Sequence, residues 1–263
     1  MKKISKIVVI ALMVALVLTA CGPKEPANEL EAVKEAGKIV FGTSADFPPF
    51  ESVDENGNFV GFDVDLMKEL GKRMGLEVEI VDMPFDSLIA AVQEGKINAS
   101  VAAFNYSEER DQAVDFTDPY YFAEDGILVA EDFADEITGP EVMANYIVGI
   151  QTGSMQEAWV VENLVDTGLL PEDNLFRYER IDQAAMDIKA GRVDMLMTEA
   201  VVTKSIAKEL GGLKVPFTGV VSNGPVNIIV PEGAKELTAE MNKYIAEMLA
   251  DGFIDSIILK HMQ

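Results

Sequence analysis

The sequence predicts an α/β protein of two lobes, each built on a mostly parallel β-sheet flanked by helices. Short β-type runs alternate with amphipathic helical stretches from residue 38 onward, and the same alternation begins again near residue 146. Two apolar strand-like segments, 126–130 and 226–230, stand where the chain would pass between the lobes. The chain would therefore leave the first lobe once and return once, through a two-stranded hinge.

In the first lobe, strands are predicted at 38–43, 78–81 and 99–102, and helices at 63–74 and 87–93. The helix at 63–74 has an apolar face made of Val64, Leu66, Met67, Leu70 and Met74. Asp63 and Asp65 superficially resemble a metal-binding pair, but Asp63 opens the helix and is better explained as its N-cap.

The second lobe shows the same alternation of predicted strands and helices. Strands are predicted at 146–150 and 193–197, and helices at 155–165, 181–189 and 201–210. After the second apolar segment, helices at 235–249 and 253–261 complete the chain. The predicted boundaries are 37–125 plus 226–263 for a discontinuous first lobe and 126–225 for a continuous second lobe. Ligands of such sheets bind beyond the carboxyl ends of the strands, here in the cleft between the lobes.

The first twenty residues have the features of a signal peptide. A positive start is followed by an apolar run, 7–18, which is too short to span a bilayer comfortably. The run ends in Leu-Thr-Ala before Cys21, a pattern that resembles the bacterial lipobox. Cys21 is the only cysteine, so an intramolecular disulfide is impossible, and we expect it to carry lipid after cleavage. Residues 21–36 would form a tether and the start of the first helix, on the extracytoplasmic face of a membrane.

Charge and composition exclude several classes of function. The net charge is −24, and such a surface repels phosphate backbones, so we expect no nucleic-acid partner. The single histidine, His261, lies two residues from the end, which argues against a Ser-His-Asp or Cys-His site. Cysteine–histidine metal spacings and glycine-rich phosphate loops are absent from the sequence. We therefore predict no catalytic residue, metal or cofactor, and favour a binding protein over a hydrolase.

Six segments stand out in order along the chain: GTSADFPPFE (42–51), GFDVDLMKELGKRM (61–74), PFDSLIAAVQEGKINAS (84–100), SEERDQAVDFTDPYY (107–121), GIQTGSMQE (149–157) and AGRVDMLMTEAVV (190–202). Together they resemble the amino-acid-binding receptors of bacterial ABC importers, the extracellular solute-binding proteins of family 3. The resemblance implies a two-lobed periplasmic-binding-protein fold of type II. It also implies a small amino-acid ligand, a membrane permease as partner and a monomeric receptor.

An amino acid offers a carboxylate and an ammonium, and the resemblance assigns a residue to each. Arg110 would bind the carboxylate, because a guanidinium is a planar donor that is always charged. Backbone N–H groups of Ala103, Asn105, Ser154 and Met155 would assist it. The alternative for Arg110 is a surface arginine paired with a neighbouring acid at a helix start.

Glu199 matches the position that would bind the ammonium, where the family more commonly has aspartate. Its alternative is an acid favoured by the dipole at a helix start. Aromatic side chains at Phe47, Phe50 and Phe85 would enclose the carbon skeleton of the ligand, with plain core packing as the alternative. Ser44 stands where receptors for cationic amino acids often carry an acid, which argues weakly against lysine or arginine as ligand.

Two competing functions stay open at this point. Cyclohexadienyl dehydratases resemble the same family and use a glutamate near the position of Glu199 as general acid. The chain could also be the sensor of a signalling system that acts through a partner. The leading prediction is passive binding, in which contacts from both lobes favour a closed form that a permease recognises.

Overall fold

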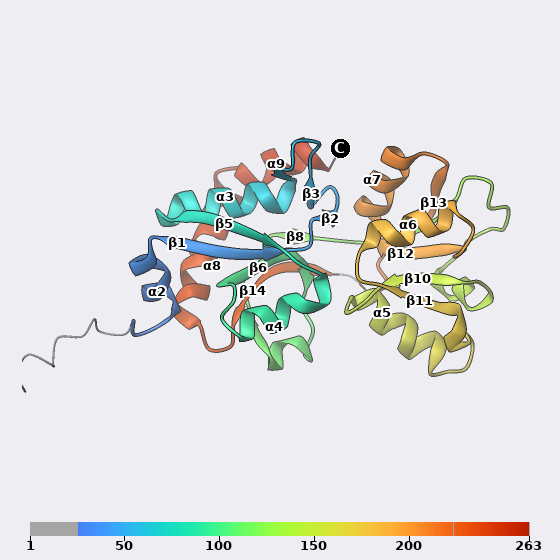
Figure 1. Ribbon diagram of the computed structural model, residues 1–263, viewed down its shortest axis with the longest axis horizontal. Coiled ribbons are helices and arrows are strands. Elements are labelled where there is room, and N and C mark those ends of the chain that lie inside the picture. The colour runs from blue at the N-terminus through green and yellow to red at the C-terminus, as the bar shows by residue number, and fades with distance from the viewer. Residues whose placement is uncertain (1–25, 223, 263) are drawn as a thin grey trace, which may run out of the picture.

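The computed structural model describes residues 26–222 and 224–262 and places two α/β lobes side by side (Figure 1). The first lobe is built on a sheet of strand order β5-β1-β6-β14-β7, with β8 added beside β14. Its strands are β1 (Lys38–Thr43), β5 (Glu77–Asp82), β6 (Ala99–Asn105), β7 (Val114–Phe116), β8 (Tyr121–Phe122) and β14 (Pro225–Pro231). Strand β1 pairs in parallel with β5 and β6, whereas β14 runs antiparallel to its neighbours.

Helices cover both faces of this sheet (Figure 1). One face carries α2 (Glu29–Ala36), α3 (Phe62–Met74), α8 (Lys235–Ala250) and α9 (Phe253–His261), and the other carries α4 (Leu88–Gln93). Ala99, Val101 and Ala103 of β6 join the core under α3 and α8, whereas Ala102 and Phe104 join the core under α4. This alternation is what a strand buried on both faces requires.

The second lobe repeats the plan with strand order β11-β10-β12-β9-β13. Its strands are β9 (Asp125–Ala130), β10 (Val148–Gln151), β11 (Leu175–Tyr178), β12 (Met195–Glu199) and β13 (Leu213–Gly219). Its helices are α5 (Met155–Val160), which continues through a π-turn at Val161–Val165, α6 (Ile181–Lys189) and α7 (Ala200–Leu210). The predicted α/β class is confirmed, but the sheets are mixed rather than mostly parallel: β10 pairs in parallel with β11 and β12, whereas β9 runs antiparallel to β12 and β13.

The two lobes are joined by short segments rather than by long strands. The apolar runs predicted at 126–130 and 226–230 lie inside the sheets as β9 and β14. The described residues of the crossings are 123–124, between β8 and β9, and 220–222 with 224, between β13 and β14. Asp125, which is fully buried, ties the crossings together. Its carboxylate accepts from the N–H groups of Val221 at 3.0 Å and Ser222 at 2.8 Å, and from the Ser222 hydroxyl at 2.9 Å.

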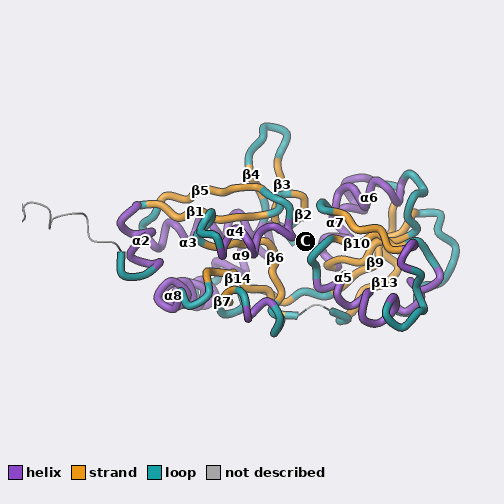
Figure 2. Tube along the Cα trace, turned by 60° about the horizontal axis from the view of Figure 1, so that its bottom comes forward, coloured by secondary structure: helices purple, strands orange, loops and turns teal. Residues whose placement is uncertain are grey.

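A small sheet of β2 (Asp46–Phe47), β3 (Glu51–Val53) and β4 (Phe59–Val60) projects beside the first lobe (Figure 2). This sheet was not predicted, because strands of two or three residues show no usable periodicity. The prediction that Asp63 caps α3 is wrong, since the N-cap of α3 is Gly61. The Asp63 carboxylate is fully buried and accepts from the Ala103 N–H and the Tyr120 hydroxyl, both at 2.9 Å.

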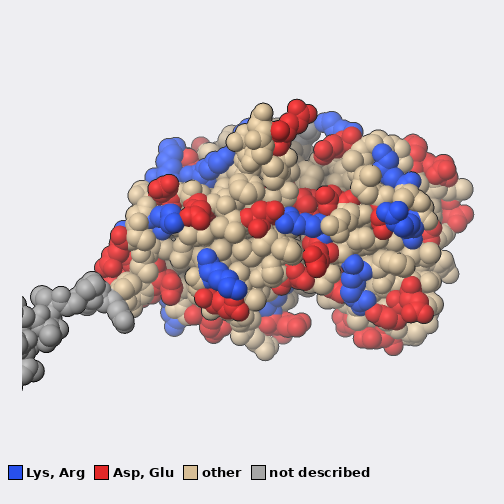
Figure 3. Space-filling model, in the orientation of Figure 1, with Lys and Arg blue, Asp and Glu red and all other residues tan. Residues whose placement is uncertain are grey.

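The surface agrees with the strongly acidic composition. Acidic side chains are distributed over both lobes with basic ones between them (Figure 3). None of the helices in the described part of the chain is long and apolar enough to cross a membrane. The predicted signal peptide and Cys21 lie outside the described residues.

We expect Gly61→Ala to destabilise the fold by several kcal/mol, roughly 3. Gly61 has φ of +132°, and a Cβ there would collide with the backbone carbonyl of Phe50. Gly57→Ala is the matched control, because Gly57 also has a positive φ, +81°, but no atom within 4 Å of its Cβ position. Urea unfolding of both variants measures the effect, and equal losses would show that backbone strain alone matters.

Candidate ligand-binding site

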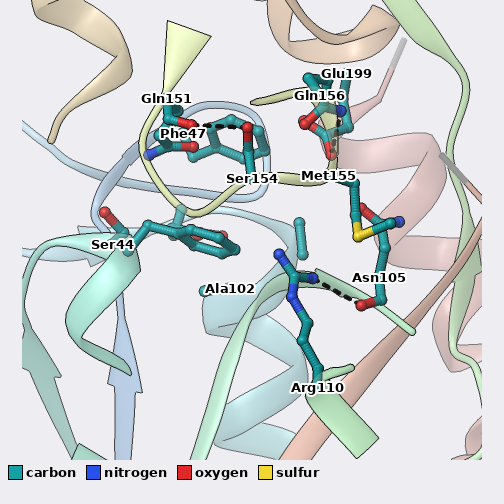
Figure 4. A pocket seen from close by; sticks show the side chains of 13 residues that line it. Ser44, Phe47, Ala102, Asn105, Arg110, Gln151, Ser154, Met155, Gln156 and Glu199 are labelled. Carbon is teal, nitrogen blue, oxygen red and sulfur yellow. Dashed lines mark hydrogen bonds between the residues drawn. The ribbon is translucent and has the colours of Figure 1, made fainter. Parts of the chain in front are cut away.

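A closed cavity lies between the lobes, at the carboxyl ends of β1, β6, β10 and β12 (Figure 4). The first lobe contributes Ser44, Phe47, Glu51, Phe85, Ala102, Ala103, Asn105 and Arg110, and the second contributes Gln151, Ser154, Met155, Gln156 and Glu199. The free space for a water-sized sphere is about 10 Å³, which is room for about one water. In this conformation the lobes are in contact around a cavity that is too small for a ligand larger than water.

Arg110 enters this cavity from the first lobe (Figure 4). Arg110 as a whole is 9% exposed. Its guanidinium lies 5.6 Å and 5.4 Å from the ring centroids of Phe85 and Phe104, and it donates to the Asn105 carbonyl at 2.8 Å. It also donates to the Gly153 carbonyl of the second lobe at 2.7 Å. Burial lowers the pKa of Arg110 to about 10, so the group stays charged at neutral pH. The alternative of a solvent-exposed arginine does not apply.

Glu199 faces the same cavity from the second lobe, at the end of β12. It is 3% exposed and accepts from the Thr198 hydroxyl at 2.9 Å and, weakly, from the Gln156 amide at 3.5 Å. Burial raises the pKa of Glu199 to about 7. It precedes α7 but makes no side-chain cap bond there. A buried carboxyl with this pKa is ready to be ionised by a cation placed next to it.

Two of the three predicted aromatic residues line the cavity. Phe47 and Phe85 do so, and the Phe85 ring is stacked on Phe104 with centroids 4.6 Å apart. Phe50 does not, because it lies fully in the core, with its ring edge-on to Phe62 at 5.9 Å and to Tyr121 at 5.6 Å. The turn into β3 points Phe50 inward and Glu51 toward the cavity.

The predicted backbone donors differ in how free they are. The Ala103 N–H is donated to Asp63, so it is not available to a ligand; Ala103 also has a left-handed φ of 48°. The Ser154 N–H makes only a long bond of 3.3 Å to the Gln151 carbonyl. Met155 opens α5, and the first N–H groups of a helix lack intrahelical acceptors. Asn105 lines the cavity with its side-chain Nδ2, which has no partner among the described residues.

Ser44 lines the cavity but its hydroxyl is used by the protein, since it donates to Asp46 at 2.7 Å. Asp46 in turn accepts from the N–H of Ile181, the first residue of α6 in the other lobe. Next to it, Arg180 of the second lobe donates to both oxygens of Asp82 at 2.8 Å and 2.9 Å. These bonds hold the lobes together beside the cavity, and we call Asp46, Asp82 and Arg180 the interlobe latch.

We expect Arg180→Ala to favour an open form of the unliganded protein, changing the free-energy difference between closed and open forms by about 1 kcal/mol, or their ratio by roughly fivefold. The effect is modest because the Arg180–Asp82 ion pair is partly solvent-exposed. Small-angle scattering would detect this as a larger radius of gyration. Arg177→Ala is the control, because Arg177 pairs with Glu157 and Glu172 of its own lobe only. An unchanged scattering curve for Arg180→Ala would mean that the latch does not set the equilibrium.

Four residues that line the cavity were not predicted from the sequence as site residues: Glu51, Ala102, Gln151 and Gln156. Glu51 Oε2 and Gln151 Nε2 are buried without a hydrogen-bond partner in the described part of the chain. Glu51 and Gln151 stand in two of the family-like segments, so their place beside Phe47 and Ser154 was a usable signal. Within the described residues no group of His, Cys, Asp or Glu is arranged to hold a metal ion.

Comparison with known proteins agrees with this geometry. Residues 39–263 match the family described as bacterial extracellular solute-binding proteins, family 3. The arginine-binding extracellular protein ArtP of Bacillus subtilis is 32% identical over 254 residues, which cover 95% of this chain and 94% of that protein.

Two solved structures are similar over most of their length. An ancestral arginine-binding protein bound to arginine superposes with a TM-score of 0.81 at 37% identity, covering 86% of this chain and 99% of that one. An ancestral amino-acid-binding protein, described as a precursor of cyclohexadienyl dehydratase, superposes with a TM-score of 0.78 at 30% identity, covering 89% and 99%. The predicted type II fold and extracytoplasmic placement are confirmed, and the chain belongs to the bacterial extracellular solute-binding proteins of family 3, as an amino-acid-binding member.

Proposed function

We propose that this protein captures one amino acid in the cavity between its lobes and delivers it to the permease of an ABC importer. The observation that carries the proposal is the pair of opposite charges on the two walls. Arg110 from the first lobe and Glu199 from the second are both buried and line one cavity. This arrangement complements the carboxylate and the ammonium of a zwitterion, and each lobe binds one of them.

Closure of the lobes would follow because each lobe holds one of the two charges of the ligand. A ligand held by Arg110 alone binds one lobe, whereas the second contact to Glu199 forms only when the lobes meet. Binding energy would therefore favour the closed form over the open one. In the closed form seen here Arg110 donates to the Gly153 carbonyl, and a ligand carboxylate would replace that weaker acceptor.

We also propose that the mature chain is a monomer attached to the membrane by lipid on Cys21. The support is the sequence around Cys21 and the location of the described fold, whose first helix α2 begins eight residues later at Glu29. A single acyl chain would bind a membrane only marginally, so stable attachment requires at least two. Metabolic labelling with a fatty acid, lost in Cys21→Ala, tests the anchor.

Isothermal titration of a soluble form beginning at Gly22 tests the function. The protein is first unfolded and refolded to remove co-purified ligand, then titrated with single L-amino acids, beginning with arginine because ArtP and the ancestral protein are named for it. Tight binding of one chemical group of amino acids is the expected result. No heat with any of the twenty would contradict the proposal.

A second candidate, a dehydratase acting through Glu199, has one observation in its favour. A general acid at neutral pH needs a pKa near 7, and burial raises the pKa of Glu199 to about 7. The similarity to a described precursor of cyclohexadienyl dehydratase points the same way. Incubation with prephenate or arogenate and detection of the aromatic product decides it. Turnover lost in Glu199→Gln would establish the enzyme, and no turnover would leave the receptor.

A further inference from the structure

Ala103, in strand β6, has a backbone conformation that residues with a side chain rarely adopt. Its φ is +48°, and it is the one non-glycine residue of the described chain with a positive φ. The left-handed region is unfavourable for a residue with a Cβ, so it persists only where the surroundings fix it. Because Ala103 lines the cavity, the contacts that fix its conformation bear directly on the shape of the site.

The strained residue lies in a bulge of β6. Phe104 pairs with Asn227 of β14. Four residues earlier Ser100 pairs with Ile229, which is only two residues from Asn227, so three residues of β6 stand opposite one residue of β14. A bulge bends its strand and re-aims the side chains that follow it. A left-handed residue in a bulge is usually glycine, whereas here it is alanine.

An acid from another part of the lobe holds the N–H group of this residue. Oδ2 of Asp63, in the first turn of α3, accepts from the Ala103 N–H and from the Tyr120 hydroxyl, both at 2.9 Å. Asp63 is fully buried, and the two donors are 3% and 2% exposed. Burial raises the pKa of Asp63 to about 6, so the carboxyl is mostly ionised at neutral pH. Hydrogen bonds to an ionised oxygen are stronger than neutral ones, so this contact opposes relaxation of Ala103 to an ordinary β conformation.

The two residues that follow Ala103 both contact Arg110. The Asn105 carbonyl accepts from Arg110 at 2.8 Å, and the centroid of the Phe104 ring lies 5.4 Å from the guanidinium. A change of φ at Ala103 would rotate the chain that follows it and move both contacts. Asp63 does not line the cavity in the described part of the chain, so its influence on a ligand passes through them.

We propose that Asp63 is a positioning residue of the binding site: by holding the N–H of Ala103 it keeps the bulge of β6 in the shape that places Arg110. The inference rests on the proposed function, in which Arg110 binds the ligand carboxylate. Binding of the ligand then depends on a carboxylate that the ligand never touches, and the start of α3 sets the geometry of a wall built by β6.

A double-mutant cycle titrated with L-arginine tests this role. Asp63→Ala removes the acceptor and should weaken binding ~100-fold, because a misplaced charged partner costs about that much. Asp63→Asn keeps an acceptor oxygen and should stay within ~10-fold of the wild type. In a chain that also carries Ala103→Gly, Asp63→Ala should weaken binding less than ~10-fold, because glycine adopts a positive φ without support. A merely structural role of Asp63 would give the same loss in both backgrounds.

The position of Arg110 is also measured without a ligand. Its guanidinium lies 5.6 Å and 5.4 Å from the ring centroids of Phe85 and Phe104, so ring currents shift its side-chain NMR resonance. Asp63→Ala should move this resonance, and the additional change Ala103→Gly should restore it. If Asp63→Ala does not fold, Asp63→Ser repeats the cycle, because its shorter side chain withdraws the acceptor from Ala103.

Asp65→Ala is the matched control. Asp65 lies on the same helix, two residues after Asp63, but pairs with Lys260 and His261 instead of with β6. An unmoved Arg110 resonance in a folded Asp63 variant would overturn the inference, as would equal affinity losses with and without Ala103→Gly. Failure of the wild type to bind any amino acid would contradict the proposed function instead, and the resonance would still decide this inference.

Discussion

Replacing Arg110 by alanine is expected to reduce amino-acid affinity on the order of 10³-fold while the protein stays folded. Arg110 is 9% exposed and is the one cationic residue that lines the cavity in the described chain. Without it a ligand carboxylate would be buried without a charged partner, and loss of one member of a buried, hydrogen-bonded charge pair is worth 2–5 kcal/mol or more. Titration calorimetry measures the affinity, and circular dichroism verifies the fold.

Arg192→Ala is the matched control for that experiment. Arg192 has a side chain 63% exposed and pairs with Asp187 on the surface of the second lobe. The two variants change the net charge equally, so a general electrostatic effect of the acidic protein would appear in both. A ligand affinity reduced less than about tenfold in Arg110→Ala would contradict the assigned role.

Glu199→Gln is expected to have two effects of opposite sign. Ligand affinity should fall ~100-fold, because the ammonium loses its charged acceptor. The unliganded variant should, in contrast, escape a pH-dependent loss of stability. The pKa of Glu199 is about 7 in the folded protein against 4.5 as its ordinary value, so between these pH values the folded protein retains a proton that the unfolded chain has lost.

The sign of that second effect follows from linkage. Since the folded state binds more protons across this window, the free energy of unfolding of the wild type falls as pH rises from 4.5 to about 7, by about 3 kcal/mol in total. The variant should lack this contribution. The difference between the unfolding free energies of the two proteins should therefore change over the same pH window and stay constant above it. Urea unfolding at several pH values measures it, with Glu162→Gln, at an exposed position, as control. A constant difference from pH 4 to 8 would show that Glu199 is not protonated in the folded protein.

Local patterns predicted the elements well, and failed where a distant part of the chain decides the outcome. Helices 181–189 and 253–261 have the predicted bounds, because their apolar periodicity and flanking glycines are local signals. Asp63 looked like a helix cap, yet it binds Ala103, forty residues away, and so removes a donor that the resemblance had offered to the ligand. Nothing near either residue in sequence records that contact.

In the site, too, some residues could be predicted from the sequence and others depend on the folded structure. Arg110 and Glu199 could be placed by motif, because the chemistry of a zwitterion demands both charges. The sequence could not show that Glu51 lines the cavity in place of the predicted Phe50. That outcome depends on the direction in which the side chains of the three-residue strand β3 point. A shift of one residue in a strand reverses inside and outside, so neighbouring side chains are the hardest to assign from sequence.

The position of Asp125 has a consequence for what the membrane partner can detect. Asp125 directly follows the first crossing, residues 123–124, and its carboxylate accepts from the N–H groups of Val221 and Ser222 in the second. It also accepts from the Gln156 amide at 3.0 Å, and that amide contacts Glu199 in the cavity. A twist of one crossing relative to the other would break these bonds, so they favour a movement in which the two crossings bend together. The proposed transporter would then meet two outlines of this receptor, and it would detect occupancy of the cavity as a change between them rather than as a graded change of shape.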